Sequence, residues 1–339
     1  MRSDLPGAGR SRNAVLSVSA SLLLFLAAQT AHAAQPDDED RFSDRWSVSF
    51  ELGAFVPHLR GLDHGLYNSP LLGDATILQS EGGLGGNGQN ANVTTTIPYR
   101  FSNPLPRKNI SPMGMVEIAW NANEKHAFFF GIGQTELASS NHVAGNLPVE
   151  QYYVSNVVDS DRTSKISYTE YTLGWRYTFF NRPHVRLYSR LSTHEVFNLS
   201  YREDWTFLFT SSPVPDLVGI RRDMVTEANA ASLFMTQLGL GAEWFLTDNI
   251  SLGLEGSYLL AEADISLRNV QQMNDFTTGD SISRPGTPTR LMPDGTLGYL
   301  NPGATIDQIR NQATRDKYYT PLRLNFSGWR AGIRFSVYF

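Results

Sequence analysis

The sequence has 339 residues, a formal net charge of −5 and no cysteine. The acidic balance excludes the strongly basic surface that nucleic-acid-binding proteins present. The absence of cysteine excludes a small secreted domain stabilised by disulfides, so an exported chain of this kind needs a large core or a closed sheet.

The N-terminus has the three parts of a secretory signal peptide. Three arginines stand before residue 13, Val15–Ala28 is apolar, and Ala31 and Ala33 are small residues spaced as a signal peptidase reads them. This order predicts a signal peptide over residues 1–33 with cleavage after Ala33. The apolar run is too short to span a bilayer as a helix. Residues 34–44 are then expected to form a periplasmic N-terminal segment.

The remainder of the chain is dominated by apolar and polar residues that alternate with a period of two, as β-strands with one buried face require. In the clearest case, Tyr171, Leu173 and Trp175 alternate with Glu170 and Thr172. The pattern predicts eight strands, at 46–56, 114–120, 127–133, 170–179, 185–191, 234–246, 250–258 and 329–339. No helix-length apolar segment follows the signal peptide, which excludes a helical membrane protein. A membrane barrel remains, because its lipid-facing and lumen-facing residues alternate.

Short and long connections alternate strictly between these segments. Short ones lie at 121–125, 181–183 and 247–249, and long ones lie at about 57–111, 138–165, 200–230 and 269–322. Outer-membrane barrels have short periplasmic turns, longer extracellular loops and an even number of strands. The sequence therefore predicts an all-β fold, a closed antiparallel transmembrane β-barrel over residues 45–339 with both termini periplasmic. Ten strands are the alternative if a loop adds a hairpin.

The proposed outward faces carry apolar residues and end in aromatic ones. A charged side chain at the midplane of such a face would cost about 2–4 kcal/mol, and none falls there in this assignment. The aromatic residues beside the short turns are Trp46, Trp120, Tyr177, Phe179, Trp244 and Phe339. Their position predicts a girdle at the membrane–water interface.

The C-terminal segment carries a more specific pattern. The chain ends in Phe339, preceded at alternate positions by Val337, Phe335 and Ile333. This segment resembles the C-terminal signature of bacterial outer-membrane barrels, which implies recognition by the outer-membrane assembly machinery. The layout of the mature chain is similar to the small eight-stranded OmpA/OmpX-type barrels of Gram-negative bacteria, with unusually long extracellular loops. We expect no peptidoglycan-binding domain after Phe339, so the cell-wall anchoring of the two-domain members is not expected to carry over.

The inward faces contain equal numbers of acids and bases. These residues are Glu51, Glu117, Glu170, Glu243 and Glu255 together with Arg176, Arg186, Arg190, Arg330 and Arg334. The interior of an eight-stranded barrel is just wide enough for side chains to fill. Because unpaired buried charges are very costly, we expect a neutral Glu/Arg network across the lumen. Glu51 and Arg334 lie on the two strands that must pair to close the barrel.

Three functions remain open, in decreasing order of support. The first is a structural or surface-interaction role with a plugged lumen, in which the glycine-rich stretch Gly82–Asn92 belongs to an adhesive loop. The second is a narrow, porin-like channel for small solutes, in which the Glu/Arg network acts as a gate. The third is a membrane hydrolase, with His194, Glu195 and Ser192 as the best candidates.

Motifs for catalysis and cofactors are weak. Neither a Gly-x-Ser-x-Gly nucleophile motif nor a His-Glu-x-x-His zinc motif is present, so the sequence predicts a non-enzyme without a cofactor. Acidic residues such as Asp159, Asp161, Asp264 and Asp275 lack EF-hand spacing. They leave open a role for divalent ions between the loops and lipopolysaccharide. The expected partners are outer-membrane lipid and lipopolysaccharide, the assembly machinery and an unidentified extracellular ligand of the loops.

Overall fold

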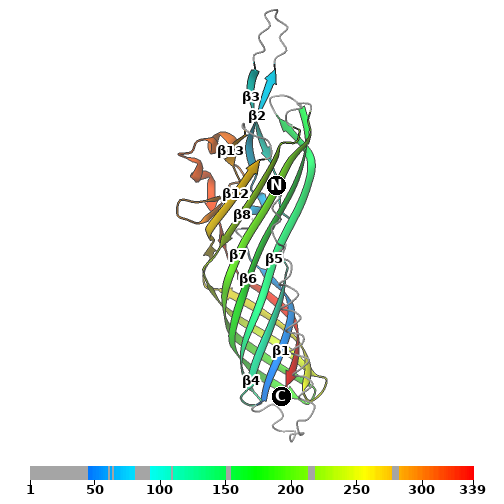
Figure 1. Ribbon diagram of the computed structural model, residues 1–339. Coiled ribbons are helices and arrows are strands. Elements are labelled where there is room, and N and C mark those ends of the chain that lie inside the picture. Colours follow the sequence, from blue (N-terminus) through cyan, green and yellow to red (C-terminus); the bar gives the residue numbers. More distant parts are fainter. Residues whose placement is uncertain are drawn as a thin grey trace, which may run out of the picture.

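The computed structural model of the protein describes residues 45–59, 62, 65–80, 92–107, 110–149, 154–212, 218–276 and 282–339. The predicted signal peptide and the segment 34–44 lie outside these residues, as does nearly all of the glycine-rich stretch Gly82–Asn92. Almost all of the described elements are strands, which form a tall closed sheet with further strands at one end (Figure 1).

Eight strands close into a ring. In order around the ring they are β1 (Arg45–Pro57), β4 (Ser111–Asn121), β5 (His126–Val149), β6 (Val154–Arg182), β7 (Val185–Ser211), β9 (Leu233–Phe245), β10 (Ile250–Ala261) and β18 (Gly328–Tyr338). All neighbours are antiparallel, and β18 pairs with β1 to close the ring, with Glu51 opposite Arg334. The predicted fold class, a closed antiparallel barrel of eight strands, is confirmed.

The alternation of the sequence sets the two faces of the ring. Leu173, Leu238 and Leu240 point outward and are each about 65% exposed. Such exposure is expected of side chains that face lipid. Their neighbours in sequence point inward and are buried or are glycine. This inside-out distribution is the one that a barrel in hydrocarbon requires, because closure pairs the backbone groups while the apolar side chains meet lipid.

The three short connections lie at one end of the ring. They follow β4, β6 and β9 at 122–125, 183–184 and 246–249. The start of β1 and the end of β18 lie at the same end, since Ser47 is opposite Tyr338. We call this end the turn end and the other the loop end.

The extent of the loops differs from the sequence-based expectation. The segments 138–165 and 200–230 are largely strands, because β5 and β6 continue as a paired ladder to Val149 and Val154. Beyond Val196, β7 leaves β9 and pairs with β8 (Arg221–Asn229), which in turn pairs with β12 (Arg268–Phe276). We call the parts of these strands within about 138–165 and 200–230 the upper strands. The sequence pattern does not predict them as strands of the barrel, because the polarity of their two faces is reversed relative to the lower parts of the strands. Inward residues such as Ile166 and Phe207 are apolar there, whereas the outward ones are polar.

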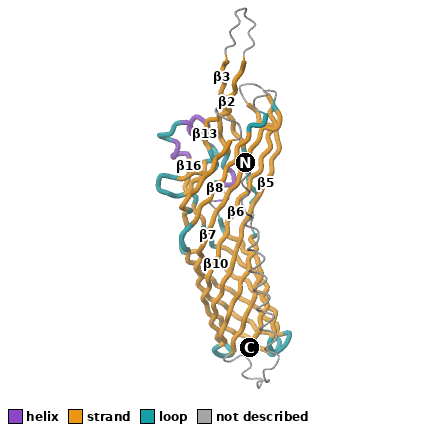
Figure 2. The backbone as a smooth tube through the Cα atoms, viewed as in Figure 1, coloured by secondary structure: helices purple, strands orange, loops and turns teal. Residues whose placement is uncertain are grey.

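The two longest connections also fold. Near β12, β2 (Leu71–Ser80) and β3 (Asn92–Phe101) form a hairpin, and β13 (Ile282–Gly286) pairs with β2. A second small sheet contains β14 (Thr289–Leu291), β15 (Leu297–Leu300) and β16 (Tyr319–Pro321), and β11 (Ile265–Ser266) pairs with β17 (Arg323–Leu324). The helical elements are η2 (Leu66–Asn68), α3 (Ile306–Arg310) and η4 (Arg315–Tyr318), coloured purple in Figure 2.

The helix α3 begins with a capping box between Thr305 and Gln308. No helix among the described residues is both long enough and apolar enough to cross a membrane.

A large apolar core lies inside the loop end of the ring. Leu66, Leu105, Leu324 and Phe326, which come from the folded connections, are nearly fully buried against inward side chains of the ring strands. The ring strands contribute residues such as Phe55, Met113, Ile166 and Leu259 to the same cluster. We call this cluster the upper tier of the lumen.

Candidate functional site

The ten charged residues predicted to face the lumen lie inside the ring, and each is at most 6% exposed. They come from seven of the eight strands: Glu51 (β1), Glu117 (β4), Glu170 and Arg176 (β6), Arg186 and Arg190 (β7), Glu243 (β9), Glu255 (β10), and Arg330 and Arg334 (β18). Each strand of the ring except β5 therefore contributes at least one charge. We call this set the lower tier.

Arg334 is the centre of the lower tier. Its Nη2 lies 3.0 Å from a carboxylate oxygen of Glu51 and 2.8 Å from one of Glu255, and its Nη1 lies 3.0 Å from Glu117. One guanidinium thus connects strands β1, β4 and β10 to β18. The planar, always charged fork of arginine suits this role, because a lysine ammonium could not present donors along the same fixed directions.

Arg190 and Arg176 complete this central cluster from the opposite wall. Arg190 lies 3.0 Å from Glu117 and 3.3 Å from Glu255, and Arg176 lies 2.7 Å from Glu117. Both guanidinium groups also lie over aromatic rings, Arg190 over Phe129 at 4.1 Å and Arg176 over Tyr188 at 4.7 Å. These contacts span the lumen from wall to wall.

Two smaller clusters lie above and below the central one. Towards the turn end, Glu243 accepts a 2.7 Å hydrogen bond from the Tyr338 hydroxyl and lies 3.8 Å from Arg186. Towards the loop end, Arg330 lies 2.8 Å from Glu170. Each of the ten charges therefore has a partner of opposite sign, which is the condition for tolerating buried ions.

His194 joins the Arg330–Glu170 pair. Its Nδ1 lies 3.2 Å from Glu170 and its Nε2 lies 3.1 Å from the Ser192 hydroxyl. The sequence had suggested Glu195 as the acidic partner, but Glu195 points outward and is exposed. Glu170 takes that place from the adjacent strand β6. Only the register between β6 and β7, which pairs His194 with Thr172, brings the two side chains together.

The order serine, histidine, glutamate resembles a hydrolytic triad, but its details favour a hydrogen-bond network. The Nε2 of His194 lies closer to Gln237 Oε1, at 2.6 Å, than to Ser192. Its Nδ1 also lies 2.9 Å from Thr172. Ser192 and His194 are no more than 2% exposed, so the Ser192 hydroxyl is not accessible to a substrate in this conformation. We assign this cluster no catalytic role.

The acidic residues considered for cation binding are engaged in other contacts. Asp159 and Asp161 both lie next to His142, at 3.3 Å and 2.9 Å, and Asp264 accepts a hydrogen bond from Asn325. Asp275 lies on β12 opposite Asp223. Within the described part of the chain, no group of three or more His, Cys, Asp or Glu side chains could hold a metal ion.

The residues of the proposed assembly signal lie on β18 and just after it. Ile333, Phe335 and Phe339 are exposed on the outward face, whereas Val337 is buried. Among the girdle residues, Trp46, Trp120, Phe179 and Trp244 are exposed, and all lie beside the turn end. Tyr177 lies there too, in contact with His126 and Trp175.

Comparisons with known proteins find similar solved structures but no match by sequence. No family model matches the sequence, and no curated protein matches it. The outer membrane protein OprG from Pseudomonas aeruginosa aligns over 89% of this chain and 99% of its own, with 9% identity and a TM-score of 0.36. The outer membrane protease OmpT from Escherichia coli aligns over 87% and 97%, with 10% identity and a TM-score of 0.31. The CymD monoaromatic hydrocarbon channel aligns over 88% and 89%, with 9% identity and a TM-score of 0.28.

The architecture of the chain itself supports a membrane assignment. Eight antiparallel strands form a closed ring with an apolar outward face, aromatic residues beside the short turns and a polar lumen. These are the properties of barrels that span bacterial outer membranes. The protein is an integral β-barrel of the outer-membrane type.

Proposed function

We propose that the protein is a closed outer-membrane barrel that displays a folded recognition structure at the cell surface. The observation that carries this proposal is that side chains fill the lumen at two separate levels. The charged lower tier crosses it near the turn end, and the apolar upper tier fills it near the loop end. A solute path would need both tiers to move.

The folded connections at the loop end support the proposed display of a recognition structure. In barrels of this type the short turns face the periplasm and the long connections face outside. On that basis, β2, β3, β13 and the sheet β14–β15–β16 form an extracellular structure (Figure 2). Recognition residues are often placed on connections that a rigid scaffold holds in position.

Buried contacts attach this structure to the barrel. Arg162 of β6 is fully buried, and it pairs with Glu203 at 2.7 Å. It also donates hydrogen bonds to the carbonyls of Leu66, Tyr67 and Asn103. One side chain therefore fixes the first connection to the wall of the upper strands. Such attachment favours a presented surface over a moving gate.

The orientation also suggests the partners of the barrel. Ile333, Phe335 and Phe339 are exposed along β18 and just after it, where they are available to the outer-membrane assembly machinery, and the outward apolar face meets lipid. Lipopolysaccharide would surround the base of the extracellular structure. The alternative role, a narrow channel for small solutes, rests on the charged lumen.

Two measurements on one refolded sample test the proposal. Faster migration of the unboiled protein on a denaturing gel, together with no conductance steps in planar bilayers, is the expected result for a folded, closed barrel. Steady discrete steps from the same sample would instead support the channel. A soluble product without a mobility shift would overturn the barrel itself.

A further inference from the structure

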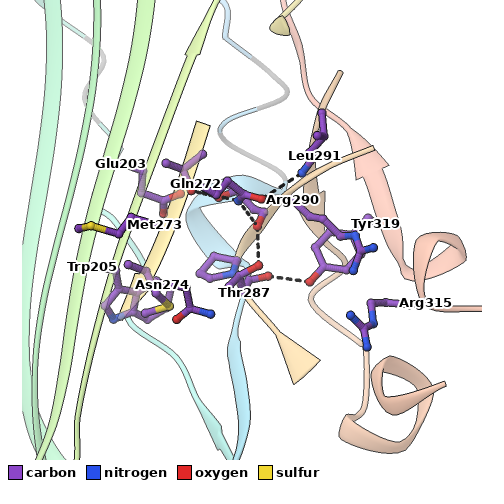
Figure 3. Close-up of a pocket in the computed structure, with 14 residues that line it drawn as sticks. Glu203, Trp205, Gln272, Met273, Asn274, Thr287, Arg290, Leu291, Arg315 and Tyr319 are labelled. Atoms are coloured by element: carbon purple, nitrogen blue, oxygen red, sulfur yellow. Dashed lines mark hydrogen bonds between the residues drawn. The ribbon is translucent and has the colours of Figure 1, made fainter. Parts of the chain in front are cut away.

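A cavity of about 350 Å³ lies in the extracellular structure, between strands β7, β8 and β12 and the small sheet β14–β15–β16 (Figure 3). Trp205 of β7 and Asn274 of β12 line one side, and Thr287, Arg315 and Tyr319 line the other. At the rim, Met273 is 55% exposed and Leu291 is 46% exposed, so the cavity opens to solvent. Its volume is in the range of small-ligand sites.

Positive charge exceeds negative charge around this cavity. Arg290 and Arg315 line it, Arg222 bonds to Asn274, and Arg162 lies over the Trp205 ring at 4.4 Å. Among the described residues, the carboxylates of Glu203 and Asp316 lie close to these arginines, and both are already paired. Glu203 lies 2.7 Å from Arg162, and Asp316 lies 3.1 Å from Arg290.

Hydrogen-bond donors are also in excess. Within the described part of the chain, Arg315 uses only its Nε, which donates to the Ile309 carbonyl at 2.8 Å, and both Nη groups lack an acceptor. Asn274 accepts a hydrogen bond from Arg222 through Oδ1, which leaves its amide N–H groups without an acceptor among the described residues. By contrast, the Thr287 carbonyl already accepts from the Tyr319 hydroxyl. A ligand here must therefore bring acceptors and negative charge.

The rest of the lining is apolar or aromatic. Met224, Met273 and Pro288 line the cavity together with the rings of Trp205 and Tyr319. A saccharide ring has polar edges and an apolar face, and it fits a site with a few directed donors over apolar surface. A carboxylate on the ring would meet the guanidinium of Arg315, whose two Nη groups match its geometry.

We propose that this cavity binds an acidic saccharide residue, with Arg315 holding its carboxylate and Asn274 donating to a ring or hydroxyl oxygen. The inference deepens the proposed recognition role and rests on it for placing the loop end outside the cell. The occupant would be a carboxylated sugar of a surface polysaccharide or glycan.

Ligand-detected NMR titration of the refolded protein in detergent tests this assignment, with D-glucuronate as the probe and D-glucose as the neutral comparison. We expect saturable binding of glucuronate and at least about tenfold weaker binding of glucose, because a hydrogen bond to a charged group is stronger than one between neutral groups. Arg315→Gln should weaken glucuronate binding by a similar factor. Asn274→Asp, which keeps the acceptor for Arg222 but adds a negative charge, should weaken it too.

Arg323→Gln is the matched control, since Arg323 is exposed on β17 and does not line the cavity. It should bind as the parent does. Absence of glucuronate binding, equal binding of glucose, or full binding by Arg315→Gln would overturn the assignment. Tighter binding of triglutamate than of glucuronate would overturn it in favour of an acidic peptide. Planar-bilayer recordings on the same samples test the closed barrel separately, so the two failures are distinguishable.

Discussion

His142 lies on the part of β5 near the loop end, where it contacts two aspartates. Its Nδ1 lies 2.9 Å from Asp161 and its Nε2 lies 3.3 Å from Asp159. The hydrogen bond to Asp161, with the nearby charge of Asp159, raises the pKa of His142 above its usual value of 6.5. The interaction stabilises the folded state fully below pH 6.5, and this stabilisation is lost as the pH rises through the raised pKa.

We therefore predict that Asp161→Asn lowers the pKa of His142 more than Asp159→Asn does, because the hydrogen bond is the larger cause. An NMR titration of the His142 ring, assigned with His142→Gln, measures this order. Asp264→Asn lies outside the cluster and should leave the titration unchanged. A pKa of His142 that does not respond to Asp161→Asn would contradict the contact.

The lumen-facing residues follow from the sequence more readily than their partners do. Alternation placed all ten charged residues on inward faces, and strand order brought Glu51 opposite Arg334. The same reasoning chose Glu195 for His194, because neighbours in sequence were the only contacts it offered. Glu170 reaches His194 through cross-strand register, which one sequence without a known pairing does not specify.

At the level of the strand, β7 changes partner at one irregular position. It pairs with β9 up to Val196 and with β8 from Ser200, and its register with β6 shifts at the same place. Between them, Asn198 has a φ of 52°, a left-handed conformation that asparagine tolerates better than most residues. The extra residue forms a β-bulge at the position where β7 changes partner, and bulges of this kind bend a strand at barrel rims.

We predict that Asn198→Val destabilises the barrel by about 1–2 kcal/mol, the cost of a left-handed conformation for a β-branched side chain that cannot hydrogen-bond locally as asparagine can. Asn198→Gly should be close to neutral. The measurement is the urea midpoint of the gel-mobility shift. Ser140→Val, on the exposed face of β5, controls for the new valine side chain. Equal midpoints for Asn198→Val and Asn198→Gly would show that the bend does not depend on backbone conformation.

The upper strands explain where the sequence-based assignment of elements ended. In the membrane, outward residues such as Leu173 are apolar and inward ones such as Arg176 are charged. Above it, outward residues such as Thr163 are polar and inward ones such as Ile166 are apolar. The period of two persists, but the apolar residues move from the outward face to the inward face where the surroundings change from lipid to water. Apolar outward faces therefore predict strands only up to the membrane boundary, and the polar outward residues beyond it resemble those of loops.

For the molecule as a whole, the two tiers differ in what they contribute. The lower tier joins strands through ion pairs, and its hub Arg334 contacts three carboxylates. The upper tier joins the folded connections at the loop end to the ring through apolar burial. Stability of the barrel therefore depends strongly on the lower tier, whereas closure of the lumen depends on both.

Arg334→Ala separates these two contributions. Removing one partner from a buried ion cluster costs about 3–5 kcal/mol, since the remaining carboxylates are left without compensation. We predict a loss of this size in the free energy of unfolding of the refolded barrel, measured by titration with urea. We also predict that planar bilayers with Arg334→Ala show no conductance steps, because Leu324, Phe326 and the rest of the upper tier still fill the lumen. Arg323→Ala, an exposed arginine outside both tiers, is the control for both readouts. Discrete steps could instead occur with Arg334→Ala and be absent from the parent and the control. The charged network alone would then close the lumen, and the upper tier would only attach the folded connections of the loop end to the ring.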